Sequence, residues 1–387
     1  MDAVRIRAVA LCILMNVVDG FDVLALTFTA PAIAAEWRLS PAQLGVLFSA
    51  SLAGMAVGAL MLSPVADRYG RRRGVLLALV LVALGMTAST LAPNRGLLLA
   101  ARVITGLGVG PLISAATATV HEFSSRRRRG LGMGLMAVAF PAGATIGGSA
   151  ALLLIEAAGW RSVFAVGAAA TIALIPVVFF GLPESPPQLR RAARFDADVS
   201  VGQGIAGRTA TRLGALFGAM MLSFYFVQTW LPKLLVQLGQ PFAIAGATGI
   251  ALNVAGMIGG IAAGLSMPRL GVERTARAAL VGMVIGIAAI GITPRWQYGP
   301  MVDAGLLGFS MFAAMASTYA LLSESFPVHH RATAIGIVST AGRVGSATGP
   351  LFAGWLLSIG IGPASIGLLL ALPCLAAALL VRRTRCS

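Results

Sequence analysis

The stretch that decides the fold is AVALCILMNVVDGFDVLALTFTAPAIA, residues 8–34, an apolar run interrupted by two aspartates. A helix needs about 20 mainly apolar residues to cross a bilayer, so this run is long enough for one span. It continues well past Asp19 and Asp22, which makes it too long for the core of an ordinary cleavable signal peptide. The segment therefore predicts a transmembrane helix with two carboxyl groups near its middle.

The composition of the rest of the chain extends this prediction. Of the 387 residues, 58% are hydrophobic and only 11% are charged, with a mean hydropathy of +0.88. Soluble domains carry about 25% charged residues, so a soluble core of this length is excluded. The net charge of +16 would suggest nucleic acid as a partner of a soluble protein. Here it predicts contact with membrane lipids and no nucleic-acid partner, because the arginines fall in alternate loops.

Apolar stretches recur along the chain and predict an all-α integral membrane protein with twelve transmembrane helices in two six-helix bundles. We expect an N-terminal bundle over residues 1–182, a cytoplasmic linker over 183–210 and a C-terminal bundle over 211–387. The predicted spans are 8–34, 41–63, 74–92, 97–120, 130–155, 162–181, 211–236, 242–266, 276–293, 299–322, 333–358 and 362–381.

The basic residues predict the orientation. Of 29 Lys and Arg, 22 lie in the N-terminus, the C-terminus and the loops that join even to odd spans, five lie on the opposite side and two lie inside spans. Cytoplasmic loops are enriched in Lys and Arg, so both termini are expected in the cytoplasm.

The two halves resemble each other at an offset near 201 residues. Arg68-Tyr69-Gly70 corresponds to Arg269-Leu270-Gly271, and Glu122 with Arg129 corresponds to Glu324 with Arg331. Parallel repeats of this kind place a binding site between the halves, near the middle of the membrane. The acidic residues do not repeat, because Asp67 corresponds to Pro268, Arg102 to Asp303, and the pair Asp19 and Asp22 to the segment 220–223.

Asp19 and Asp22 are the strongest candidates for chemistry. Their i, i+3 spacing places both carboxyls on one face of the helix. Intramembrane charge costs several kcal/mol and like charges repel, so we expect at least one of the two to spend time protonated, as a proton carrier must. A pair of structural carboxyls that caps backbone or binds an arginine is the alternative.

Two arginines lie inside predicted spans. Arg102, in RVITGLGVG, is the expected counter-ion of the acidic pair, and Gly106, Gly108 and Gly110 allow another backbone to approach closely. A purely structural ion pair is its alternative. Arg343, in STAGRVGSATGP, stays charged at any working pH and is expected to bind a substrate carboxylate, with a structural role as the alternative.

Further substrate-binding candidates are polar or aromatic. In the seventh span Tyr225 and Gln228 lie one turn apart, and Trp230 marks either a ligand contact or the membrane interface. Asn16 and Phe21 of the first span complete the set.

Candidate gating residues lie at the predicted cytoplasmic ends of spans. An acid followed by basic residues suits an electrostatic latch that forms and breaks as the halves move. These candidates are Asp67, Arg68, Gly70, Arg71, Glu122, Glu324 and Arg331.

These residues carry a resemblance to a known family. DRYGRRR (residues 67–73) and RVITGLGVG (102–110) resemble signature motifs of the major facilitator superfamily, although Ser63 stands where a leading glycine is usual. DGFDVLALTFTAPAI (19–33) and ESFPVHHRATAIGIVSTAGRVGSATGP (324–350) resemble the aromatic acid:proton symporters of that superfamily. The resemblance implies proton-coupled import of a benzoate-like or hydroxybenzoate-like carboxylate across the bacterial inner membrane. Two departures, the short chain and Pro268 in place of an acid, bear on gating and substrate range.

Other function classes fit the sequence less well. Efflux of amphipathic drugs by proton antiport is the alternative transport function, but Arg343 favours an anion over a cationic drug. An enzyme or a non-transporting sensor is disfavoured, because His121, His329 and His330 show no metal-ligand spacing. We expect no cofactor and no metal, a proton gradient as the driving force, and a monomer.

Overall fold

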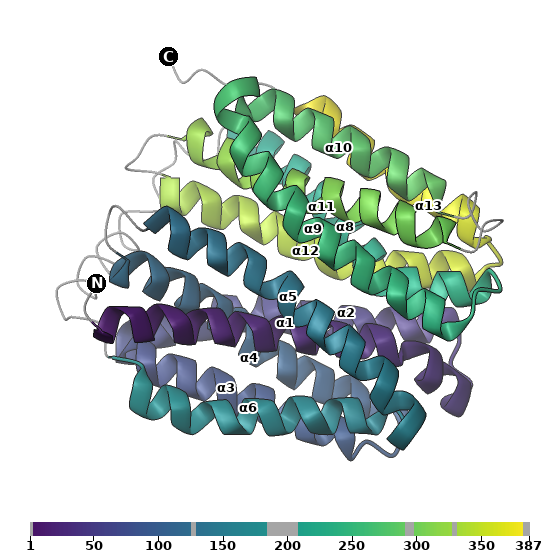
Figure 1. Cartoon of the computed structure of the whole chain (residues 1–387), viewed down its shortest axis with the longest axis horizontal. Helices are drawn as coiled ribbons and strands as arrows, with labels where there is room; N and C mark the ends of the chain where they lie inside the picture. Colours follow the sequence, from purple (N-terminus) through teal and green to yellow (C-terminus); the bar gives the residue numbers. More distant parts are fainter. Residues whose placement is uncertain (1–2, 125–128, 184–207, 291–297, 327–330, 382–387) are drawn as a thin grey trace. The chain divides into compact units, whose positions relative to one another are not determined.

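The computed structural model describes residues 3–124, 129–183, 208–290, 298–326 and 331–381, which form twelve α-helices (Figure 1). The helices are α1 (Ala3–Trp37), α2 (Pro41–Tyr69), α3 (Arg71–Thr90), α4 (Arg95–Phe123), α5 (Arg129–Ala158), α6 (Arg161–Gly181), α8 (Arg208–Gln237), α9 (Phe242–Leu270), α10 (Val272–Ala289), α11 (Gly299–Ser325), α12 (Arg331–Ser358) and α13 (Pro363–Leu380).

Ten of these described helices are long and apolar enough to cross a membrane. The other two, α10 and α12, do not meet both conditions, and their composition explains why. The helix α10 is only 18 residues long and carries Glu273, Arg274 and Arg277 near its start, whereas α12 carries Arg343 among small and hydroxyl-bearing residues. The predicted all-helical membrane fold is therefore confirmed, with α1 longer than expected and α10 beginning at Val272, four residues earlier than the predicted span.

The helices group into two compact units. The first comprises residues 1–37 and 50–199, and the second comprises 38–49 and 200–387. The beginning of α2 thus belongs with the second unit, where the Phe48 ring lies 5.4 Å from that of Trp230. The division into residues 1–182, 183–210 and 211–387 stays a prediction, since most of the linker lies outside the described residues.

Helix pairing within one unit repeats within the other. In the first unit α1 packs on α5 and α6, and α3 packs on α4 and α6. In the second unit α8 packs on α12 and α13, and α10 packs on α11 and α13. Five helices of each unit therefore follow the same packing scheme, as a parallel repeat requires.

Glycines fix the crossing points of this scheme at the offset that the sequence indicates. A Cβ on Gly143 would lie 1.9 Å from the Val17 carbonyl oxygen, and one on Gly345 would lie 2.1 Å from that of Gly218. The first pair maps onto the second with offsets of 202 (345 − 143) and 201 (218 − 17). Small residues that let backbones touch are the usual basis of helix packing in membranes.

A single glycine connects the second and third helices of each unit. Gly70 has φ 109° and Gly271 has φ 83°, a region of backbone conformation that side chains with a Cβ avoid. The next helix begins at the following residue in both cases. The repeated Arg-x-Gly pattern therefore has a backbone reason: only glycine makes this turn without strain.

Candidate functional site

The candidate site is built around Arg102, which is 0% exposed in α4. The predicted close approach of its neighbouring glycines is confirmed. Gly106 and Gly110 lie against the backbone of α2 at Ser51 and Met55, while Gly108 lies against α3 at Ala78. Because α2 and α3 approach α4 this closely, the arginine side chain is enclosed by protein.

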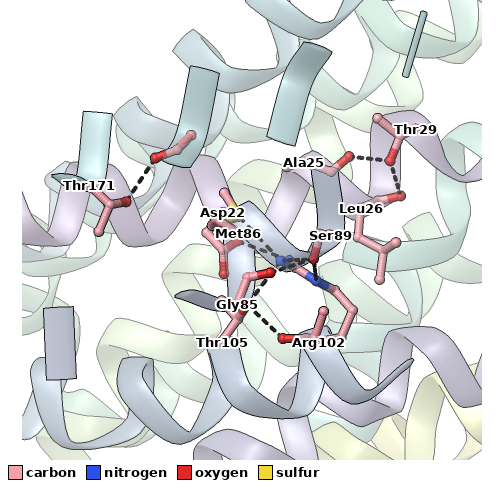
Figure 2. Close-up of polar contacts among 12 residues, drawn as sticks. Asp22, Ala25, Leu26, Thr29, Gly85, Met86, Ser89, Arg102, Thr105 and Thr171 are labelled. Atoms are coloured by element: carbon pink, nitrogen blue, oxygen red, sulfur yellow. Dashed lines mark hydrogen bonds and ion pairs between the residues drawn. The ribbon is translucent and has the colours of Figure 1, made fainter. Parts of the chain in front are cut away.

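The guanidinium of Arg102 is bound on several sides (Figure 2). Its Nη1 donates to Asp22 Oδ1 at 3.0 Å, which forms a buried ion pair between α4 and α1. Its Nε and Nη2 donate to Ser89 Oγ at 3.1 and 2.8 Å, and Nη2 also donates to Thr105 Oγ1 at 2.9 Å. The Met86 sulfur lies 3.2 Å from Nη2. The charge is thus held by one carboxylate and by hydroxyls of α3 and α4.

An aromatic ring covers one face of the same guanidinium. The Arg102 Cζ lies 4.9 Å from the centroid of Phe164, a fully buried residue of α6. Trp160 meets Phe164 edge to face at 5.9 Å, and its Nε1 donates to Glu36 at 2.6 Å. Cation–π contacts strengthen when water is excluded, so Phe164 stabilises the arginine charge independently of Asp22.

Asp19 and Asp22 are both 2% exposed. The structure therefore confirms that α1 carries two carboxyl groups that are buried within the protein, one helical turn apart. Arg102 Nη1 lies 3.0 Å from Asp22 Oδ1. The role of either residue in proton coupling stays a prediction.

The two other candidates of α1 contact the first unit. Asn16 is half-buried, and its Nδ2 donates to the Met136 carbonyl at 2.6 Å. The Phe21 ring packs against Gly147 of α5 and Gly167 of α6. Both side chains therefore support the packing of α1, and their assignment to substrate stays a prediction.

The aromatic and polar candidates of α8 lie at different depths. Trp230 is 0% exposed and its Nε1 donates to the Pro350 carbonyl at 3.1 Å, so it does not mark a lipid interface. Gln228 is also buried and donates from Nε2 to Asn253 Oδ1 at 3.0 Å. Tyr225, one turn earlier, is half-buried and packs beside Phe224.

Arg343 is half-buried in α12, within electrostatic range of Tyr319 on α11. The Tyr319 ring lies 5.2 Å from that of Phe217, and Phe217 also packs against Gly342. A guanidinium is planar and matches the geometry of a carboxylate. The binding of a substrate carboxylate by Arg343 stays a prediction.

The gating candidates are only partly described. Gly70 makes the turn before α3, and Glu324 is exposed near the end of α11. The other gating side chains lie outside the described part of the structure; they are Asp67, Arg68, Arg71, Glu122 and Arg331.

Sequence reasoning missed several contacts that organise the units. Arg161 donates to Glu36 at 2.9 Å and lies 4.2 Å from the Trp160 ring. In the second unit Arg277 Nη2 donates to the carbonyl of Val381, just beyond the end of α13, at 2.7 Å. A signal existed for the first cluster, because the acid at one span end and the Trp-Arg pair at another are both predicted on the same side of the membrane. Among the described residues, no group of three or more His, Cys, Asp or Glu could hold a metal ion.

Comparison with known proteins identifies the family. A model described as Major Facilitator Superfamily matches residues 12–318 and 301–385. The chain is 30% identical to the gallate transporter of Pseudomonas putida, over 96% of this chain and 90% of that protein. It is 30% identical to the 3-(3-hydroxy-phenyl)propionate transporter of Escherichia coli (strain K12), over 92% and 88%. It is 28% identical to the 4-hydroxybenzoate transporter PcaK of Pseudomonas aeruginosa, over 92% and 86%.

A crystal structure of a D-xylose-proton symporter shares the fold, with a TM-score of 0.78 at 18% identity over 95% of this chain and 97% of that one. The resemblance expected from the first-helix and signature motifs is thereby confirmed, and so is the expectation of a transporter rather than an enzyme. The chain is a multi-pass membrane protein that belongs to the Major Facilitator Superfamily.

Proposed function

We propose that this protein imports a small aromatic carboxylate together with protons across the bacterial inner membrane. The observation that carries the proposal is the buried ion pair between Asp22 and Arg102, one turn from a second buried carboxyl at Asp19. The relatives named above are transporters of gallate, 3-(3-hydroxy-phenyl)propionate and 4-hydroxybenzoate, which are all aromatic carboxylic acids.

The ion pair supplies a protonation-dependent contact. A carboxylate binds the guanidinium strongly, whereas a protonated carboxyl loses the charge attraction. Guanidinium groups are not deprotonated in proteins, so the proton exchanges on the acid and not on the base. Protonation from one side of the membrane and release to the other would then alternate the strength of the contact between α1 and α4, and so bias the transporter between two states.

Arg343 is the residue proposed to bind the carboxylate of the substrate. It lies within electrostatic range of Tyr319 in the second unit, whereas the acidic pair lies in the first. A proton that enters with each monovalent carboxylate cancels its charge, so the membrane potential does not oppose uptake. Further protons would let the potential drive accumulation.

Uptake into proteoliposomes tests the proposal. Purified protein is reconstituted, and radiolabelled 4-hydroxybenzoate uptake is measured with and without an inward proton gradient. We expect gradient-driven accumulation by the native protein and its loss in Asp22→Asn, while exchange of internal for external substrate persists. Glu156→Gln, which alters an exposed carboxyl of α5, serves as the matched control. Unchanged accumulation in Asp22→Asn together with Asp19→Asn would refute proton coupling by this pair.

The proposed orientation has both termini in the cytoplasm and the gating residues at cytoplasmic helix ends. Reporter fusions distinguish the two sides: a fluorescent protein folds on a cytoplasmic C-terminus, whereas alkaline phosphatase is active only outside. Phosphatase activity of a C-terminal fusion would contradict the assigned orientation.

A further inference from the structure

A buried relay of amide groups lies in the second unit, between α8 and α9. Gln228 is 3% exposed and Asn253 is 1% exposed. Gln228 Nε2 donates to Asn253 Oδ1 at 3.0 Å, and Asn253 Nδ2 donates to the Gly249 carbonyl at 2.9 Å. The relay therefore ends at a backbone carbonyl of α9.

That carbonyl fixes the direction of the whole relay. A carbonyl only accepts hydrogen bonds, so Asn253 must turn its NH₂ group toward Gly249 and its oxygen toward Gln228. The Asn253 oxygen in turn needs a donor, so Gln228 must present its NH₂ group to it. The orientation of both amides is thus set by the hydrogen-bond network and not by an arbitrary choice of amide flip.

The consequence is a buried acceptor at the other end. Gln228 Oε1 is buried, and no residue within the described part of the chain donates a hydrogen bond to it. Buried polar groups are nearly always hydrogen-bonded, and each exception needs an explanation. An acceptor of fixed orientation is complementary to a ligand that brings an O–H or N–H group.

Aromatic residues precede Gln228 by one turn of α8. Tyr225 lies one turn before Gln228 on α8 and is half-buried. Its ring lies 5.5 Å from that of Phe224, which in turn meets Phe312 of α11 at 5.4 Å. Ligand sites are typically apolar and aromatic, with a few polar groups that fix orientation.

We propose that Gln228 Oε1 accepts a hydrogen bond from a ring hydroxyl of the substrate, so that the transporter selects hydroxylated aromatic acids over unsubstituted ones. The inference rests on the proposed function and narrows its substrate class. A carboxylate cannot fill this role, because the ionised group has no proton to donate. Sites built to bind a substrate hydroxyl discriminate strongly against the analogue without it, because the buried acceptor then loses its partner.

The test compares benzoate with 3- and 4-hydroxybenzoate as competitors of exchange in proteoliposomes. We expect the better hydroxylated acid to compete at least about tenfold more strongly than benzoate. Gln228→Met keeps a similar side-chain length and removes the amide oxygen. It should bring the ratio of the two acids' competition close to one, because the hydroxylated acid binds more weakly while the binding of benzoate does not improve. Gln237→Met, an exposed glutamine of the same helix, is the control and should keep the ratio.

A second variant tests the direction of the relay. Asn253→Leu removes the acceptor that orients Gln228, so the amide can turn and the discrimination should fall while Gln228 remains present. Direct binding of the three acids to purified protein, measured by calorimetry, gives the same ratio without transport. Monodisperse elution of each variant shows that it is folded.

Two results would overturn the inference: benzoate and both hydroxybenzoates bind equally well to the native protein, or Gln228→Met keeps the native ratio. Either result would be expected if only water occupied the acceptor. Absence of gradient-driven uptake would instead refute the proposed function, and calorimetric discrimination would still decide the inference.

Discussion

Because Asp22 and Arg102 form a buried ion pair, we expect substitution of either residue to destabilise the protein, but by different amounts. Each partner is at most 2% exposed, and the two atoms are 3.0 Å apart. Removal of one member of a buried pair costs about 3–5 kcal/mol, because it leaves an uncompensated charge. The two single variants should nevertheless differ, since only one of the remaining charges can be neutralised.

Asp22→Asn leaves a guanidinium that cannot lose its proton in a protein. Its destabilisation should therefore be the larger of the two and nearly independent of pH. Arg102→Met leaves a buried carboxylate, which can become neutral by taking up a proton. Its destabilisation should therefore be smaller at pH 5 than at pH 8.

The double variant should recover part of the loss. Ser89 and Thr105 each donate to a carbonyl of their own helix, at Gly85 and Ala101, so loss of the arginine leaves neither hydroxyl without an acceptor. Coupling energies between contacting residues are about 0.5–3 kcal/mol. We therefore expect the double variant to melt above Asp22→Asn.

Thermal melting of the detergent-purified variants, followed by intrinsic fluorescence at several pH values, measures this order. Additive losses in the double variant would refute the coupling. Equal pH dependence of the two single variants would refute the argument from charge.

Two further predictions concern the packing around the pair. Phe164→Leu should lower the melting temperature, because a desolvated cation–π contact contributes about 2 kcal/mol. The loss should shrink in an Arg102→Met background, and an unchanged loss would show that the ring acts by packing alone. Gly143→Ala should greatly reduce the yield of folded protein, because the added Cβ would lie 1.9 Å from the Val17 carbonyl oxygen. Gly134→Ala on the same helix meets nothing within 4 Å and should give a normal yield, as measured by size-exclusion chromatography.

The fold was predictable because its main signals can be read from the sequence itself. Apolar runs of membrane length, alternate basic loops and a 201-residue offset each follow from the sequence without knowledge of contacts. The close approach of other backbones to the glycines of α4 was also predictable, since small residues in membrane helices commonly let two backbones come together. Arg102 could be matched to the acidic pair by depth alone.

The finer geometry was not predictable, because α1 is apolar on nearly all sides and its pattern assigns no face to a particular neighbour. Asp19 and Asp22 share one face, so spacing could not predict the 3.0 Å contact between Asp22 and the arginine. Phe21 was grouped with substrate-binding residues, yet its ring packs on glycines of α5 and α6. The hydrogen bonds from Arg102 to the Ser89 hydroxyl depend on the packing of α3 on α4, which cannot be read from the pattern of a single helix.

The repeat preserves the residues that pack the helices but not the acidic residues of the candidate site. Glycine crossings recur in both units at matching positions, but the residue that corresponds to Asp22 is Ser223. Its hydroxyl is buried and donates to the Leu370 carbonyl of α13 at 2.7 Å, so this position joins helices in the second unit without a charge.

Ser223→Ala should therefore cost about 1 kcal/mol, the net value of one hydrogen bond. Because the substitution removes no titratable group, it should leave the ratio of gradient-driven uptake to exchange unchanged. Asp22→Asn should lower the same ratio sharply, since it removes a proton-binding group at the equivalent position. Parallel measurement of both variants in the same proteoliposomes separates the two effects. A ratio that fell equally in both would show that helix packing at this position, and not protonation in the first unit, controls coupling.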